Sequence, residues 1–408
     1  MSSGSPSSDS PSIGADSLLQ ANYNSNVFFP AGSRDNLKFL VATANLEAEI
    51  VKNERPKGIR YLEIPSVVRE CQNNDLKISG DLKIPSSIDC RGEEPLSLRC
   101  SEDGNNVLVG CFSGCIKVYN LTNGELEQSL EPTPAEDEDG ELECSPLSRI
   151  KVKGHRLEGR SYSSIVSATY FSGFLRIWDY TNGSLLGQVQ DENKEVEYLC
   201  LSLNPFIDVT AVGLCNGNIK LYDENTLQVT SVLRRSSFAS AVDGHNDKVF
   251  CIQNHPLNPN EFISAGWDET LQYWDARIPK AVRSIFGPFV CGEGLEFDSS
   301  GKEVLIANWR SEQSLQTIDY STGKILTEFE PESQPYYLYS AKYVGKEHII
   351  TVGSDKSIVK VYDVNKALPV ASITNLSNEI YDVCVQRKNL EKCMIAVQNQ
   401  VLCIEFGK

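Results

Sequence analysis

The chain has 408 residues, of which 55 are acidic and 38 are basic, and its formal net charge at neutral pH is −17. This acidic balance argues against general binding to nucleic-acid backbones or to anionic membranes. The first residues, MSSGSPSSDSPS, lack the basic and apolar regions of a secretion signal, and no apolar run is long enough to cross a bilayer. We expect a soluble cytoplasmic protein, with the nucleus as the alternative compartment.

Three segments follow one another along the chain. Residues 1–34 are rich in Ser, Pro and Asn, which predicts a disordered tail. Residues 35–94 begin with two alternating stretches, KFLVATANLEAEIV and GIRYLEI, and continue with a weaker stretch, NNDLKISGDLKIPSSIDCRGEE, that could hold one more edge strand. From residue 95 to the end, short strands and turns alternate regularly. We interpret residues 35–408 as one all-β domain.

The strands after residue 95 form a repeat. Every third strand ends in a similar tripeptide, such as VYN, IWD, LYD or YWD, and these ends fall at Asn120, Asp179, Asp223, Asp275, Asp319, Asp363 and Glu405. Their spacing is close to the period of about 40–45 residues that is typical of four-stranded propeller blades. Two longer intervals contain insertions, at residues 132–143 and 234–244.

Seven such ends predict seven blades. The last end lies so close to the end of the sequence that the final blade lacks its outer strand, and we expect the segment 35–94 to supply it. Strands from both ends of a chain then share a blade, so that no sheet edge stays open. The alternative is eight blades, with residues 38–64 forming most of the extra one.

The best-formed repeat is His245 to Arg277, HNDKVFCIQNHPLNPNEFISAGWDETLQYWDAR. It resembles one blade of the WD-repeat β-propeller family. The resemblance implies a structural hydrogen-bond series that runs through Trp274, Ser264, His245 and Asp268. A His, a Ser and an Asp could also form a hydrolase triad, but a nucleophile needs an exposed or strained turn, and Ser264 falls in mid-strand.

The resemblance also implies where partners bind, because the turns between the second and third strands usually lie on the binding face of such propellers. Four of the first six turns carry a large aromatic residue, where Ser, Asp, Asn or Gly is usual. The fifth turn adds an arginine, and Trp with Arg is a pairing enriched at interface hot spots. The candidates are Phe112, Phe171, Trp267, Trp309 and Arg310, with Tyr336 in a loop between blades. The alternative is that these rings pack on one another and seal the loops.

Two further sites are candidates for regulation. The ending W-D-A-R resembles the box by which some propellers dock to the adaptor of cullin-type ubiquitin ligases, and the matching contact residues are Asp275 and Arg277. In the insertion, LRRSSF resembles the target of a basophilic kinase at Ser237. A solvated basic loop is the simpler interpretation of that segment.

Catalytic and cofactor motifs are absent from the sequence. It has no phosphate-binding Gly-Lys loop, no GxSxG elbow and no HExxH. Cys111 and Cys115 are close in sequence, but structural zinc needs four convergent ligands, so we expect neither metal nor cofactor. We therefore predict a non-catalytic scaffold for proteins or peptides, either monomeric or part of a larger complex.

A propeller enzyme is the remote alternative. The inner strands predicted at LCLSLN, VFCIQN and YDVCVQ offer few titratable groups. Two or more carboxylates, or a histidine, in the central channel would favour an enzyme.

Overall fold

The computed structural model describes residues 76–132, 145–153, 164–238, 241–329, 337–354, 358–376, 379–386 and 392–406, together with the backbone of a two-stranded hairpin, Ala135–Glu136 and Leu142–Glu143. All of them lie within the compact unit Ile59–Lys408. The strands expected within residues 38–64, and Tyr336, fall outside these ranges. Within them, no helix is both long and apolar enough to span a membrane.

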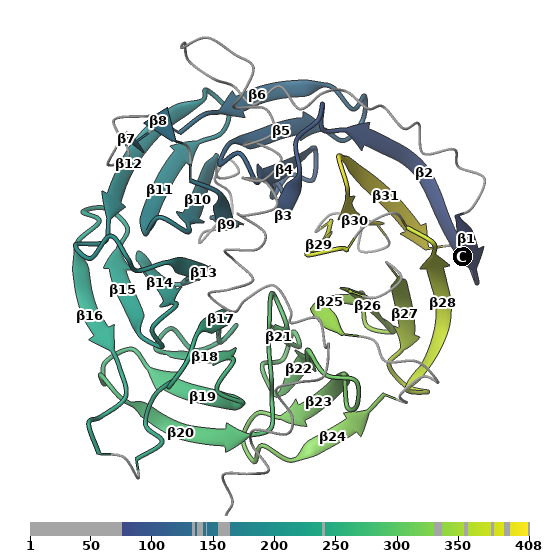
Figure 1. The fold of residues 1–408 in the computed structure, drawn as a ribbon. Helices are drawn as coiled ribbons and strands as arrows, with labels where there is room; N and C mark the ends of the chain where they lie inside the picture. Colours follow the sequence, from purple (N-terminus) through teal and green to yellow (C-terminus); the bar gives the residue numbers. More distant parts are fainter. Residues whose placement is uncertain are drawn as a thin grey trace, which may run out of the picture. The chain divides into compact units, whose positions relative to one another are not determined.

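Seven antiparallel sheets surround a common centre in the described part of the chain (Figure 1). The first three blades are β3–β6 (Pro95–Cys100, Asn106–Cys111, Ile116–Asn120, Leu126–Leu130), β9–β12 (Leu147–Val152, Ile165–Tyr170, Phe174–Asp179, Ser184–Gln190) and β13–β16 (Tyr198–Leu203, Val209–Leu214, Ile219–Asp223, Val229–Leu233). The hairpin β7–β8 falls within the insertion between blades 1 and 2.

In blades 4 to 6, as in blades 1 to 3, the strands follow one another in sequence order from the centre outward. They are β17–β20 (Val249–Asn254, Glu261–Gly266, Thr270–Asp275, Ala281–Phe286), β21–β24 (Leu295–Phe297, Glu303–Ala307, Leu315–Asp319, Ile325–Glu328) and β25–β28 (Leu338–Val344, His348–Gly353, Val359–Asp363, Leu368–Thr374). Every tripeptide that marks a repeat in the sequence lies at or near the end of the third strand of its blade. The prediction of seven blades is therefore confirmed.

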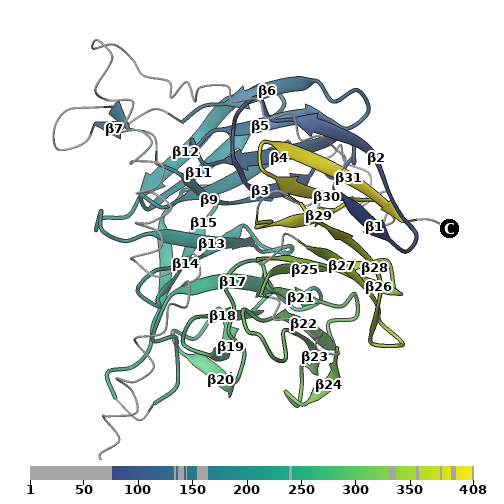
Figure 2. The ribbon, with the colours of Figure 1, turned by 45° about the vertical axis from the view of Figure 1, so that its right-hand side comes forward.

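Blade 7 is completed by a strand from the other end of the described chain. Its three C-terminal strands, β29 (Val383–Val385), β30 (Lys392–Val397) and β31 (Gln400–Phe406), pair in series, and β2 (Leu82–Asp89) pairs antiparallel with β31. Both ribbon views show β2 beside β31 (Figures 1 and 2). The preceding strand β1 (Lys77–Ser79) adds a fifth strand to blade 6, beside β28. The predicted closure by an N-terminal strand is thus confirmed.

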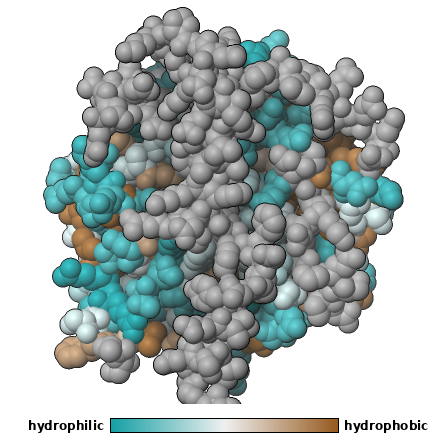
Figure 3. All heavy atoms as spheres, in the orientation of Figure 1, coloured by the Kyte–Doolittle hydropathy of each residue, from teal (hydrophilic) through white to brown (hydrophobic). Residues whose placement is uncertain are grey.

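The hydrophobic core lies between neighbouring blades. Second strands such as β26 are buried along almost their whole length, whereas outer strands such as β12 are largely exposed. Each core cluster joins two blades, as Leu108 of blade 1 does when it packs with Leu147 and Val166 of blade 2. Apolar side chains also reach the surface on the outer strands. On the face drawn in Figure 3, hydrophobic residues lie among hydrophilic ones.

Glycine ends the second strand where two blade segments approach closely. A Cβ atom on Gly266 would lie 1.8 Å from the carbonyl oxygen of Lys248, and one on Gly353 would lie 2.0 Å from that of Tyr337. Only glycine fits at such distances. The Gly-Trp and Gly-Ser pairs that open these turns are therefore imposed by packing of the blade.

We predict that closure depends on Ile88, the buried apolar residue near the end of β2. It is 6% exposed and packs with core residues of blades 1 and 7. Ile88→Ala should lower the free energy of unfolding by about 2–5 kcal/mol, because it removes buried methyl groups and leaves a cavity. Ile78→Ala on β1, where the side chain is 43% exposed, is the matched control and should change it by no more than about 0.5 kcal/mol. Equal effects in urea unfolding would contradict a special role for β2.

Candidate functional site

The polar residues of the fourth repeat form one buried hydrogen-bond series. The indole N–H of Trp274 donates to Ser264 Oγ at 2.7 Å, and Ser264 Oγ lies 2.6 Å from His245 Nε2. On the other side of its ring, His245 Nδ1 lies 3.0 Å from the carboxylate of Asp268. The indole of Trp274 also stacks on Phe262, with ring centroids 6.0 Å apart.

This arrangement ties the strands of the blade together. Ser264 is fully buried and its hydroxyl contacts both Trp274 and His245, so it has no access to a substrate. Burial alone would raise the pKa of Asp268, but hydrogen bonds from His245, the Asn246 N–H and the Thr270 hydroxyl outweigh it and hold that pKa below its usual value. The carboxylate is therefore a permanent acceptor in the series.

Aromatic and cationic side chains meet between blades 4 and 5, in a group we name the blade 4/5 cluster: Lys248, Phe250, Trp267, Phe289 and Arg310. Trp267 stacks on Phe289 at 6.0 Å and contacts Phe250 at 5.6 Å. The Lys248 ammonium lies 5.1 Å from the centre of the Trp267 ring, and the Arg310 guanidinium 5.8 Å from that of Phe289. Arg310 also pairs with Glu269 at 2.8 Å.

A second aromatic group connects blades 5, 6 and 7. Trp309 stacks on Tyr337 at 4.3 Å, and Tyr339 lies between Trp309 and Tyr381 at 6.5 and 5.3 Å. Trp267 and Trp309 are both partly buried, so the rings pack on one another and also retain exposed surface. The structure therefore contains features of both interpretations that the sequence left open.

Phe112 and Phe171 occupy the corresponding turns of blades 1 and 2. Each is half-buried, and each backbone N–H donates to the chain just before the inner strand of its blade, at Glu94 and Pro146. Neither belongs to the two aromatic groups of blades 4 to 7. Tyr336 lies outside the described residues.

Asp275 and Arg277 engage each other at the end of β19. Arg277 Nε and Nη2 donate to the two oxygens of Asp275 at 2.8 and 2.5 Å, and the Arg277 side chain is 70% exposed. The hydrogen bond from Arg277 lowers the pKa of Asp275. Any partner that contacts these residues must compete with this exposed pair.

Ser237 lies in the connection between β16 and β17, and its side chain is exposed. The ring of the next residue, Phe238, is 75% exposed. Arg235 is turned back onto the loop, where its Nε donates to the Ala241 carbonyl at 2.8 Å. The serine is therefore accessible for modification.

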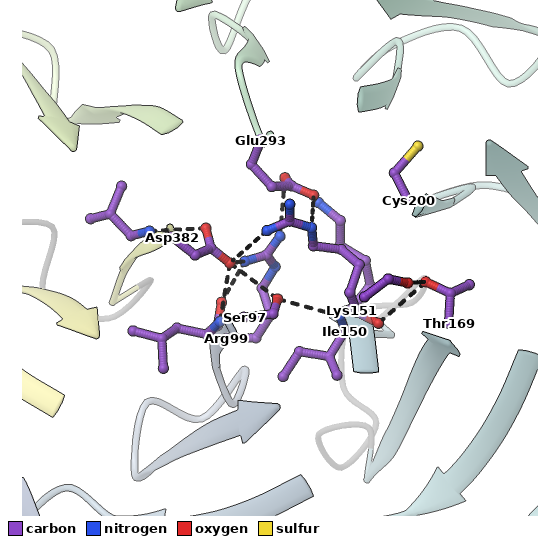
Figure 4. Close-up of polar contacts among 12 residues, drawn as sticks. Ser97, Arg99, Ile150, Lys151, Thr169, Cys200, Glu293 and Asp382 are labelled. Carbon is purple, nitrogen blue, oxygen red and sulfur yellow. Dashed lines mark hydrogen bonds and ion pairs between the residues drawn. The ribbon is translucent and has the colours of Figure 1, made fainter. Parts of the chain in front are cut away.

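The sequence did not reveal a charged cluster at the centre of the ring, which we name the channel cluster: Arg99, Arg149, Lys151, Lys342, Glu293 and Asp382. Figure 4 labels Arg99, Lys151, Glu293 and Asp382 of this cluster. The cations come from the inner strands β3, β9 and β25. The carboxylates stand just before the inner strands β21 and β29. Five of the seven blades contribute.

Both carboxylates are held by several donors. Asp382 Oδ2 accepts hydrogen bonds from the Ser97 hydroxyl at 3.1 Å, the Leu98 N–H at 3.0 Å and Arg99 Nη1 at 2.8 Å. Glu293 Oε2 lies 2.7 Å from Lys151 Nζ and 3.0 Å from Arg99 Nη2.

Burial alone would raise the pKa of Glu293. The surrounding cations, Lys151 foremost, hold that pKa well below its usual value. Glu293 therefore stays ionised, whereas a general acid or base needs a pKa near the working pH.

This cluster corrects the expectation that the inner strands carry few titratable groups. Of the three strands considered in the sequence, YDVCVQ supplies Asp382, while the cations come from PLSLRC, LSRIKV and LYSAKYV. Two carboxylates in the channel were expected to favour an enzyme. Glu293 and Asp382 are two such groups, but both are paired with cations. The nearby thiol of Cys200 is also unsuited to nucleophilic attack, because burial raises its pKa well above the usual value.

Cys111 and Cys115 have a third potential metal ligand beside them. Their sulfur atoms and a carboxylate oxygen of Glu93 lie within 4.8 Å of one another. Lys117 Nζ lies 3.5 Å from Glu93 and already supplies a positive charge there. The Ser113 hydroxyl donates to Cys115 Sγ at 3.1 Å. A cation would have to compete with Lys117 for this site.

These features define a seven-bladed β-propeller whose fourth blade contains the hydrogen-bond series of Trp274, Ser264, His245 and Asp268. A family model described as "WD domain, G-beta repeat" matches residues 236–275, the segment that contains most of that repeat. The seven blades and this match together identify a WD-repeat β-propeller.

Several proteins of known name are similar to parts of the chain. Mouse pre-mRNA-processing factor 19 is 24% identical over 42% of this chain, a stretch that spans 32% of the mouse protein. The Dictyostelium discoideum periodic tryptophan protein 2 homolog is 22% identical over 51% of this chain and 20% of its own length. The matches thus span about a third or less of these relatives.

A solved structure shares the whole fold. One chain of the crystal structure of a mitotic checkpoint complex superposes with a TM-score of 0.65 at 14% identity, over 87% of this chain and 97% of that one. At this identity the likeness shows the propeller fold alone.

We predict that Ser264→Ala lowers the free energy of unfolding by about 1–3 kcal/mol, because two buried groups, the Trp274 indole N–H and His245 Nε2, lose their common partner. Ser129→Ala on the exposed outer strand β6 serves as the control and should change stability by less than about 0.5 kcal/mol. Thermal and urea unfolding measure both. A Ser264→Ala protein as stable as the control would mean that the series contributes nothing.

Proposed function

We propose that the protein is a non-catalytic interaction scaffold that binds a protein or peptide across the turns between the second and third strands of blades 4 to 6. The blade 4/5 cluster carries this proposal. It combines Trp267 and Phe289 with the cations Lys248 and Arg310, and the Arg310 side chain is 33% exposed. Aromatic rings with a neighbouring arginine are the composition enriched where interfaces gain most of their binding energy.

The relatives support the scaffold class but not one partner. Their names refer to different processes, pre-mRNA processing in one case and a telomerase component in another. Because one fold serves many functions, these names do not select a pathway for this chain. We place the protein in the cytoplasm, with the nucleus as the alternative, and imaging of the tagged chain tests this.

Charge reversal of Arg310 tests the binding face. Arg310→Glu should reduce the recovery of bound proteins in affinity purification with mass spectrometry, because it places a carboxylate beside Glu269 and removes the cation from Phe289. A loss of one such contact corresponds to about tenfold in affinity. Lys324→Glu is the matched control, since Lys324 is exposed at the opposite end of strand β23. The same co-purifying proteins from both variants, at equal thermal stability, would refute the proposal.

A substrate receptor of a cullin-type ubiquitin ligase is the second candidate function. The exposure of Arg277 favours it, since 70% of that side chain is open to a partner. If Asp275 and Arg277 form the docking site, the ligase adaptor should co-purify with the wild-type chain and be lost with Arg277→Ala. Stability should hardly change, because an exposed ion pair contributes about 0–1 kcal/mol. Absence of the adaptor from wild-type preparations would remove this candidate.

We also propose Ser237 as a phosphorylation site. Its exposure supports the proposal, and a phosphate would add about −1.5 to −2 charges to the loop. Phosphopeptide mapping of the protein isolated from cells tests it, and an unmodified Ser237 would leave a solvated loop as its only role.

A further inference from the structure

The channel cluster contains more positive than negative charge. Four cations face Glu293 and Asp382. A third carboxylate, Glu296, interacts with Lys342 and Lys151 and accepts a hydrogen bond from the Tyr343 N–H at 2.7 Å. Burial raises the pKa of Glu296. Even with this carboxylate, four cations face three carboxylates. Within the described residues, at least one cation of the cluster therefore has no carboxylate of its own.

Arg149 is the least satisfied of these cations. Its side chain is only 9% exposed, yet Nε lies 3.9 Å from Glu293 and Nη1 lies 3.6 Å from Asp382. Both distances are too long for a hydrogen bond. Nε and Nη1 have no hydrogen-bond partner among the described residues. Buried donors without acceptors are rare in folded proteins, and their presence requires an explanation.

The excess of positive charge also affects the pKa of the neighbouring Lys151. Burial is the largest cause that lowers the pKa of Lys151 to about 8, and repulsion from Arg99 and Lys342 adds to it, against the attraction of Glu293. The acceptors that could relieve this repulsion are already engaged, because Glu293 contacts Lys151 and Arg99 and Asp382 accepts three hydrogen bonds.

We propose that the channel is a binding site for a small oxyanion, held by Arg149 and Lys151. Tetrahedral phosphate-type groups suit this pair, because a guanidinium donates two parallel hydrogen bonds to such oxygens and an ammonium adds a point charge. The anion comes either from solution or from a phosphorylated side chain of a bound partner. The proposal does not depend on the binding face of blades 4 to 6, since it uses none of its side chains.

A purely structural role is the competing explanation. In that case Arg149 would act only as a tie between blades, and its removal would leave buried carboxylates without a counter-charge and destabilise the ring. In our proposal Glu293 retains Arg99, Lys151 and Lys342 without Arg149. Arg149→Gln should therefore keep its melting temperature close to that of the wild type and bind the anion more weakly.

Sulfate is the first probe, because it does not titrate near neutral pH. Isothermal titration of the full chain, at constant ionic strength set with chloride, should show saturable binding. Arg149→Gln should weaken it about tenfold or more, the effect of losing charge-assisted hydrogen bonds. Arg277→Gln, at an exposed arginine outside the channel, is the matched control and should bind as the wild type does. General stabilisation by sulfate acts equally on all variants and does not saturate.

Proton uptake gives an independent signature. A bound anion raises the pKa of Lys151 from about 8, so binding at pH 8 should take up protons, and binding at pH 6, where Lys151 is already charged, should not. Lys151→Met should abolish the uptake, and it also keeps the proposal testable if Arg149→Gln does not fold.

A short phosphoserine peptide is the second probe. It distinguishes a free anion from a phosphorylated side chain of a partner. Tighter binding of the peptide than of sulfate indicates a partner's side chain, and equal or weaker binding indicates a free anion. Lack of saturable binding of either probe to the wild type, or unchanged binding in both channel variants, would overturn the proposal. Arg310→Glu should leave sulfate binding intact, which separates this test from that of the binding face.

Discussion

Closure of the ring by β2 and β31 is the constraint on which the other features depend. Each blade buries its faces against two neighbours, so a gap would expose both blade 1 and blade 7. The seam is also joined at the centre, where Asp382 of blade 7 accepts hydrogen bonds from Ser97, Leu98 and Arg99 of blade 1. The outer pairing and the inner contacts are therefore two parts of one closure.

A closed ring allows a polar centre in an otherwise apolar domain. The channel cluster draws on residues of blades 1, 2, 5, 6 and 7, and it is positive although the whole chain carries a formal charge of −17. Its position is fixed by strands that are buried on both faces. The hydrogen-bond series of blade 4 differs, because Trp274, Ser264, His245 and Asp268 bond to one another in turn within a single blade.

The repeat could be predicted because its signal is local in the sequence. The channel cluster could not be predicted, because its residues lie far apart in the sequence. Tripeptides such as YWD mark third strands without any knowledge of neighbours, and they fixed seven blades. Arg99 and Asp382 are separated by 283 residues, and no sequence spacing predicts that they meet. The partly buried state of Trp267 has the same cause, since Phe289 reaches it from the connection that leads to blade 5.

The closing strand β2 gave only a weak signal in the sequence because of its composition. In β2 the side chains of Lys83, Pro85, Ser86 and Ser87 are exposed, and the register shifts between Lys83 and Ser86, so the apolar alternation is lost. Such residues are typical of edge strands that must not pair with other molecules. Synthesis begins at the N-terminus, so β2 leaves the ribosome more than 300 residues before β31. Until β31 is made, β2 lacks the strand it pairs with, and its lysine and proline are residues that disfavour pairing with other chains.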